Sequence, residues 1–164
     1  SAHVGVANLP GQAPEKLLTL ARRERDAGRN LNARLLYSGA AGLWYRGPNL
    51  SLGEHRVAVA EMQSIPPVPP FDTAPPWQIR AGDRTIPVVW MKPLLGAEDR
   101  KIFLELTVDA RGLAAEDAER TNRALISAFK TAHPEYAEVF DGIVATAQFD
   151  EGRTFRSVDP ADRP

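Results

Sequence analysis

Residues 101–109 read Lys-Ile-Phe-Leu-Glu-Leu-Thr-Val-Asp and give the clearest strand signal in the chain. Apolar and polar side chains alternate here, with Ile102, Leu104, Leu106 and Val108 in one set and Phe103, Glu105, Thr107 and Asp109 in the other. Successive side chains of a strand point to opposite faces, so this period of two predicts one buried and one solvated face. The buried face needs a second layer, which helices on one side of a sheet would provide.

The same period of two continues on both sides of this stretch. It predicts a strand over 77–81, a turn at Gly82-Asp83, and a second strand whose inner face is Ile86, Val88 and Trp90. Because Pro87 has no N–H to donate, this second strand is expected to be an edge strand or to contain a bulge. Alternation resumes over 143–149, and a short last strand is expected from Phe155.

The longest helical pattern covers 114–132. Its buried stripe is predicted to be Ala118, Asn122, Leu125, Ile126 and Phe129. His133-Pro134 marks its end, because a residue before proline avoids helical backbone. Three strands, a long helix and two strands therefore follow one another, and the short connections favour antiparallel neighbours.

The first third of the chain predicts helices. Pro14 suits a first helical residue, Gly28 a left-handed helix end, and Asn30 the cap of a second helix that ends at Gly47-Pro48. Few residues separate the two helices, so an antiparallel pair is expected. Ser51 and Glu54 have the spacing of a capping box and predict a third helix, although 55–60 also alternates as a strand would.

Seven residues of the first two helices have the spacing of a tetratricopeptide repeat: Leu17, Leu20, Ala21, Gly28, Ala33, Tyr37 and Ala40. The resemblance covers about one repeat, whereas about three copies are needed to bury a continuous core. The alternative, which we favour, is an ordinary pair of helices with small residues where they cross.

Residues 66–76 contain six of the 14 prolines. Such a run favours polyproline II and predicts a stiff connector, anchored by Phe71 and Trp77. We therefore predict an α+β fold: a helical layer over 13–65, the connector, and an antiparallel β-β-β-α-β-β sheet with one long helix on one face over 77–158. These parts are expected to form a single domain over 13–158, between a flexible lead-in over 1–12 and a flexible tail over 159–164.

The 164 residues carry 20 basic and 21 acidic side chains, for a net charge of −1. This balance argues against a nucleic-acid binder, and the lack of cysteine excludes disulfides and thiol catalysis. No apolar run is long enough for a transmembrane segment. The histidines are far apart, and phosphate-binding loops and nucleophile elbows are missing, so we expect no metal, no cofactor and no catalytic residues.

Two groups of residues are candidates for binding. Arg22, Arg25 and Arg29 share one helix face in a segment, 14–46, whose net charge is +4 while the rest carries −5. The second group is aromatic with a basic rim and comprises Trp44, Tyr45, Arg46, Phe71 and Trp77. For each group the alternative is structural, a solvated helix face or core packing.

We therefore predict a non-enzymatic protein-binding or assembly module with a protein partner. The alternative is a small-molecule binder or small hydrolase whose site, between helices and sheet, includes Trp90, Glu105 and His133. A third possibility is a domain of a bacterial envelope assembly, tethered to the membrane through a segment before Ser1. The compartment, periplasmic or cytoplasmic, is left open.

Overall fold

The computed structural model describes residues 3–45, 53–96 and 100–161. The chain divides into two compact units. The helical unit comprises Ser1–Val68 with Leu95–Lys101, and the sheet unit comprises Pro69–Leu94 with Ile102–Pro164. The single domain expected over 13–158 stays a prediction.

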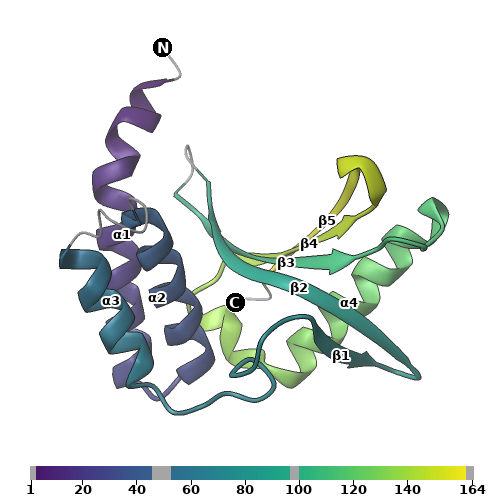
Figure 1. The fold of residues 1–164 in the computed structure, drawn as a ribbon, viewed down its shortest axis with the longest axis horizontal. Coiled ribbons are helices and arrows are strands. Elements are labelled where there is room, and N and C mark those ends of the chain that lie inside the picture. The colour runs from purple at the N-terminus through teal and green to yellow at the C-terminus, as the bar shows by residue number, and fades with distance from the viewer. Residues whose placement is uncertain (1–2, 46–52, 97–99, 162–164) are drawn as a thin grey trace. The chain divides into compact units, whose positions relative to one another are not determined.

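Three helices build the helical unit: α1 (His3–Asp26), α2 (Asn30–Trp44) and α3 (Gly53–Gln63) (Figure 1). Gly28 ends α1 with a φ of 80°, as its position predicts. The amides of Gly28 and Arg29 donate to the carbonyls of Arg25 and Glu24, so the last turn of α1 is closed by backbone hydrogen bonds. Most residues of the repeat-like pattern lie where the helices pack, since Leu17, Ala21, Ala33, Tyr37 and Ala40 are all buried.

Three details of the helical prediction are corrected. α1 begins at His3, so residues 3–12 are helical and not a loose lead-in, and Pro14 is an interior residue rather than the first one. The fixed φ of proline permits helical backbone there, at the cost of one missing backbone hydrogen bond. Asn30 is the first residue of α2 and not its cap, since Arg29 holds the non-helical cap position. The predicted cap Ser51 and the helix end at Gly47-Pro48 lie outside the described residues, and α3 itself confirms helix over strand at 55–60.

The proline-rich connector is held by the two aromatic residues expected to anchor it. Phe71 is buried and packs edge-on against Trp77, with ring centroids 5.5 Å apart. Trp77 Nε1 donates a hydrogen bond to the Thr73 carbonyl at 2.9 Å. Residues 69–72 form a turn, so the connector is not the continuous polyproline II segment that its composition predicts.

The sheet has five strands in the order β1-β2-β3-β4-β5. They are β1 (Trp77–Ala81), β2 (Arg84–Leu95), β3 (Ile102–Asp109), β4 (Gly142–Gln148) and β5 (Thr154–Pro160). β1 pairs antiparallel with β2 across the predicted turn, and β4 pairs antiparallel with β5. The predicted α+β fold, with helices and a mostly antiparallel sheet, is confirmed.

β3 and β4 are parallel, which corrects the expectation of a fully antiparallel sheet. Leu104 lies opposite Ile143 and Leu106 opposite Ala145. The connection between these strands contains α4 (Ala118–Ala132), and a crossover of that length returns the chain in the same direction. The expectation that short connections make neighbouring strands antiparallel therefore does not apply to β3 and β4.

β2 differs from its prediction at Pro87, where the edge-strand alternative is wrong and the bulge stays a prediction, and at Trp90. Pro87 lies in an interior strand, whereas β1 is the edge. Ile86 and Val88 are buried as predicted, but Trp90 is 59% exposed and so is not part of the buried inner face. The strand continues past Trp90 to Leu95.

Helix α4 lies against one face of the sheet (Figure 1). Its buried residues are Ala118, Thr121, Asn122, Leu125, Ile126 and Phe129. Asn122 Nδ2 donates to the carbonyls of Ala145 and Phe155 and to Ser157 Oγ, at 3.1 to 3.2 Å. The helix is therefore tied to both β4 and β5 by a fully buried amide.

The end of the chain also differs from its prediction. Asp159 and Pro160, expected in a flexible tail, belong to β5 and lie opposite Ile143 and Gly142. The backbone extends the pairing further, because the Ala161 amide donates to the Asp141 carbonyl at 2.8 Å. Residues 162–164 lie outside the described part of the chain.

Gly142 gives a first test of this packing. A Cβ at this position would lie 2.7 Å from both the Asp159 carbonyl oxygen and Phe103 Cε2. We expect Gly142→Ala to lower the free energy of unfolding by about 1–3 kcal/mol, because the backbone of β5 must move. Gly42→Ala is the control: a Cβ there meets nothing within 4 Å, and alanine should stabilise α2 by about 0.5–1 kcal/mol. Urea denaturation measures both, and equal stability of the two variants would contradict this packing.

Candidate functional site

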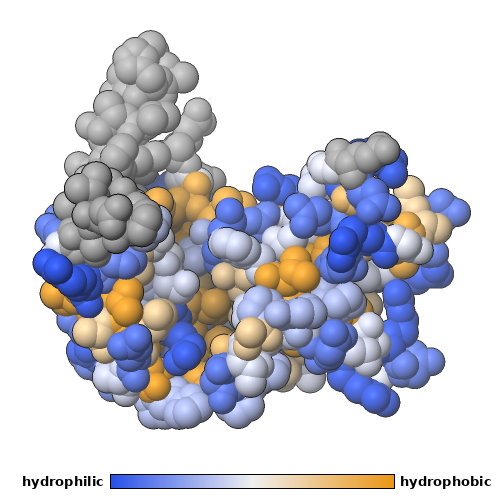
Figure 2. All heavy atoms as spheres, in the orientation of Figure 1, coloured by the Kyte–Doolittle hydropathy of each residue, from blue (hydrophilic) through white to orange (hydrophobic). Residues whose placement is uncertain are grey.

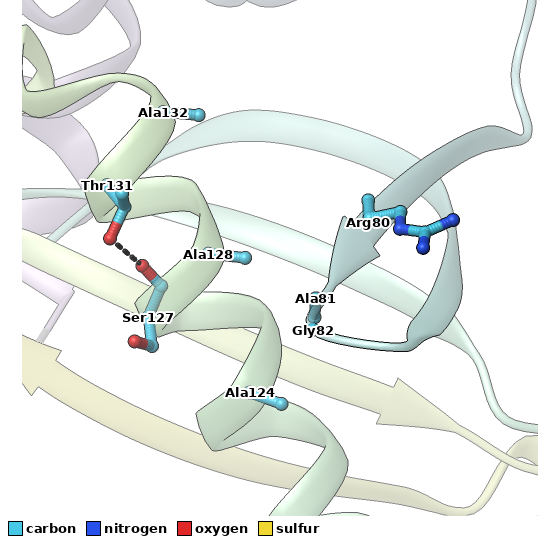
Figure 3. A pocket seen from close by; sticks show the side chains of 8 residues that line it. All are labelled: Arg80, Ala81, Gly82, Ala124, Ser127, Ala128, Thr131 and Ala132. Carbon is cyan, nitrogen blue, oxygen red and sulfur yellow. Dashed lines mark hydrogen bonds between the residues drawn. The ribbon is translucent and has the colours of Figure 1, made fainter.

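A groove in the sheet unit runs between β1 and α4. It has a volume of about 600 Å³ and is lined by Arg80, Ala81 and Gly82 on one side and Ala124, Ser127, Ala128, Thr131 and Ala132 on the other. Figure 3 shows the β1–β2 hairpin facing the helix across this space. Only small side chains project from the helix, which is why the space is not filled.

The helix side of the groove follows from the spacing of alanine in α4. Ala124, Ala128 and Ala132 recur every four residues and so share one face, and their methyl groups point toward β1 (Figure 3). Leu125 and Phe129, one position further along, are buried. The bulky side chains of α4 thus fill the core, while its small ones border the groove.

The strand side of the groove is the edge of the sheet. Within the described residues, β1 has a neighbouring strand on one side only. Ala81 and Arg84 flank a two-residue turn, so they form a hydrogen-bonded pair, and such pairs alternate with non-hydrogen-bonded ones along the hairpin. Arg80 and Gln78 fall at the non-hydrogen-bonded positions. Their backbone N–H and C=O groups therefore point away from β2, toward the open edge.

An aromatic cluster lies beside the Ala132 end of the groove. His133 caps α4 and packs against Phe129 and Phe71, with centroids 4.9 and 5.7 Å away. Phe71 in turn contacts Trp77, the first residue of β1. Burial lowers the pKa of His133 below its usual 6.5, although Glu135 opposes this, so the imidazole is neutral at pH 7. The cluster joins the start of β1 to the end of α4.

Two of the predicted arginines converge on one carboxylate in the helical unit. Arg22 donates two hydrogen bonds to Glu61, at 2.7 and 2.9 Å, and Arg25 donates to it at 3.2 Å. The Tyr37 hydroxyl also donates to Glu61, at 2.7 Å. These bonds, led by those from Arg22, lower the pKa of Glu61 from 4.5 to about 2, while burial and the Glu61 carboxylate raise the pKa of Tyr37 to about 12.

The third arginine pairs with a different acid. Arg29 donates two hydrogen bonds to Glu24, at 2.7 and 2.9 Å, and Asn32 adds another at 2.9 Å. Glu24 is fully buried. Burial alone would raise its pKa, but the hydrogen bonds and charges of these partners outweigh burial and lower it. The predicted basic face is therefore largely neutralised by acids of its own unit.

The aromatic group falls in both units. Trp44 is buried in α2, whereas Tyr45 is 50% exposed and its ring lies 5.7 Å from that of His55. Phe71 and Trp77 belong to the sheet unit, in the cluster described above. Arg46 lies outside the described residues.

The alternative set of Trp90, Glu105 and His133 is not brought together. Ser157 faces α4, and its neighbour Arg156 therefore points to the opposite face of the sheet. Glu105 lies on that opposite face, since it accepts hydrogen bonds from Thr146 at 2.8 Å and Arg156 at 3.2 Å. Glu105 is only 4% exposed and so is not the solvated residue that alternation predicts. His133, at the end of α4, is on the other side.

The groove itself was not predicted from the sequence. The repeat of alanine at 124, 128 and 132 was visible, but small residues on a helix indicate close packing as readily as an open space. Figure 2 shows hydrophilic side chains over most of the visible surface, with apolar ones in scattered spots. In the described residues there is no group of acids and histidines suited to a metal ion, and no helix with the length and hydropathy to span a membrane.

No family model, curated protein or solved structure compared with this chain matches it.

The ion cluster around Glu61 predicts a specific acid sensitivity. A folded-state pKa below the unfolded value stabilises the fold above pH 4.5, and this stabilisation is lost as the pH falls toward about 2. We expect Glu61→Gln to lower stability at pH 7 by about 1–3 kcal/mol and to flatten the pH dependence between those values. The exposed Glu15→Gln is the control, and thermal unfolding across this range is the measurement. A parallel pH profile for Glu61→Gln and wild type would contradict the cluster.

Proposed function

We propose that this chain is a protein-binding module that takes an extended segment of a partner as an additional strand on the edge of β1. The observation that carries the proposal is the outward-facing backbone of Gln78 and Arg80 beside a groove bordered by small side chains. An open strand edge is a template for pairing with another chain, and recognition by strand addition uses these groups.

The groove suits such a segment in its side-chain chemistry. In an added strand, alternate side chains would point toward α4. The methyl groups of Ala124 and Ala128 leave room there for bulky apolar side chains, and the Ser127 and Thr131 hydroxyls offer polar contacts at the rim. The Arg80 side chain points away from the helix (Figure 3), so an acidic residue on the outer face of the segment would be favoured.

The length of β1 limits the strength of binding. The strand has five residues, so an added segment can form only a few main-chain hydrogen bonds. Such a contact fits a weak or reversible interaction better than a permanent assembly. Of the two predicted roles, protein binding and assembly, the short length of β1 therefore favours binding.

Arg80 allows a test of strand addition with a matched control. We expect Arg80→Pro to weaken peptide binding by about tenfold or more, because proline removes an edge N–H that β2 does not use. Arg80→Ala removes only the side chain, so its affinity should stay within about threefold of wild type. The ligands would be peptides of about ten residues selected from a random phage-displayed library on the immobilised wild-type chain.

The location of binding is read by isotope-labelled amide NMR. Selected peptides should shift the amides of Gln78, Arg80 and the 124–132 segment. Ala128→Leu should also weaken binding by filling the groove. Failure to select any peptide, peptides that shift only other regions, or equal binding by the proline and alanine variants would each refute strand addition.

A further inference from the structure

A second hollow, of about 240 Å³, lies where β2 begins and β3 ends. Its polar lining comes from Arg84 and Thr85 at the start of β2, from Asp109 and Arg111 after the buried part of β3, and from Thr121 of α4. Apolar walls are provided by Ile86, Val108 and Leu113. Charged and hydroxyl groups on apolar walls are the composition of a small-ligand site.

Two of the three charges in this hollow cancel. Arg111 donates to both carboxylate oxygens of Asp109, each at 2.9 Å, and its backbone amide adds a bond at 3.2 Å. These bonds hold the pKa of Asp109 below its usual value, so the carboxylate is ionised at neutral pH and the pair has no net charge. The charge left over is that of Arg84.

The Arg84 side chain has most of its hydrogen-bonding capacity unused. Its Nη2 donates to Thr121 Oγ1 at 3.0 Å, and no carboxylate in the described part of the chain pairs with it. A guanidinium has five N–H donors, so four are left. Thr121 is only 3% exposed and accepts the Arg84 bond, which leaves its own O–H proton to donate. Within the described residues, the other N–H groups of this partly buried cation and the O–H of the buried hydroxyl therefore have no protein acceptor.

We propose that this hollow binds a small carboxylate, with Arg84 and Thr121 as its binding residues. One uncompensated positive charge matches a monoanion, and the planar fork of a guanidinium pairs with the two oxygens of a carboxylate. The volume admits a short aliphatic or aromatic acid whose apolar part rests on the walls. The site is separate from the groove, whose lining includes neither residue.

The test is an amide NMR titration of the full chain with sodium acetate and sodium benzoate at constant ionic strength. Both acids should shift the Gly112 and Thr121 amides saturably, with dissociation constants of about millimolar order. Sodium chloride and sodium phosphate are the comparison anions. Shifts no larger with the acids than with chloride, or tighter binding of phosphate, would overturn the carboxylate assignment.

Variants then assign the site to Arg84. Arg84→Gln should weaken benzoate binding at least about tenfold, whereas Arg56→Gln, at an exposed position of α3, should leave it unchanged. If Arg84→Gln does not fold, Arg84→Lys keeps the charge but loses the fork and should weaken binding less. Benzoate binding that is unchanged in a folded Arg84 variant would overturn the proposal.

Discussion

The sheet unit depends on the need to cover the apolar face of β3 and β4. Leu104, Leu106, Ile143 and Ala145 are completely buried and lie on neighbouring parallel strands, so one layer must exclude water from all of them. Helix α4 provides that layer and at the same time connects the two strands. Its large side chains are committed to this face, and Asn122 fixes its position on β4 and β5. The side of α4 toward β1 is thereby left to small residues, and the groove lies along it.

The helical unit satisfies a different constraint, which is the burial of charge. Glu24 is fully buried, and an unpaired charge there would be strongly destabilising, whereas the Glu61 side chain is partly buried, at 24% exposed. Arg29 and Asn32 donate hydrogen bonds to Glu24. Arg22, Arg25 and Tyr37 donate hydrogen bonds to Glu61. Because Glu61 is on α3 while Arg22 and Tyr37 are on α1 and α2, this one carboxylate links all three helices. Arg22, Arg25 and Arg29, which contribute to the positive charge of residues 14–46, therefore stabilise the helical unit by pairing with its acids.

Local patterns in the sequence predicted most of the elements, because polarity periods and helix ends depend on near neighbours. The strand at 102–109, the turn at Gly82-Asp83, the helix end at Gly28 and the boundary at His133 are of this kind. The parallel pairing of β3 and β4 and the interior place of Pro87 depend on topology, which no local period encodes. The candidate sites were the least predictable part. Whether an arginine is exposed or paired depends on acids far away in the sequence, such as Glu61, which lies 39 residues from Arg22, and an empty space leaves no pattern of its own.

The β1–β2 hairpin explains how an open groove can persist beside a packed core. At its tip, Arg84 reaches across to Thr121 and fixes the hairpin to the first half of α4. At the other end, Trp77 and Phe71 connect the start of β1 to His133 at the end of the helix. The groove is thus bounded by two fixed ends, and its walls cannot collapse onto each other without breaking a hydrogen bond or an aromatic contact. A preformed groove reduces the entropy lost on binding, which matters most for a short segment that can make few contacts.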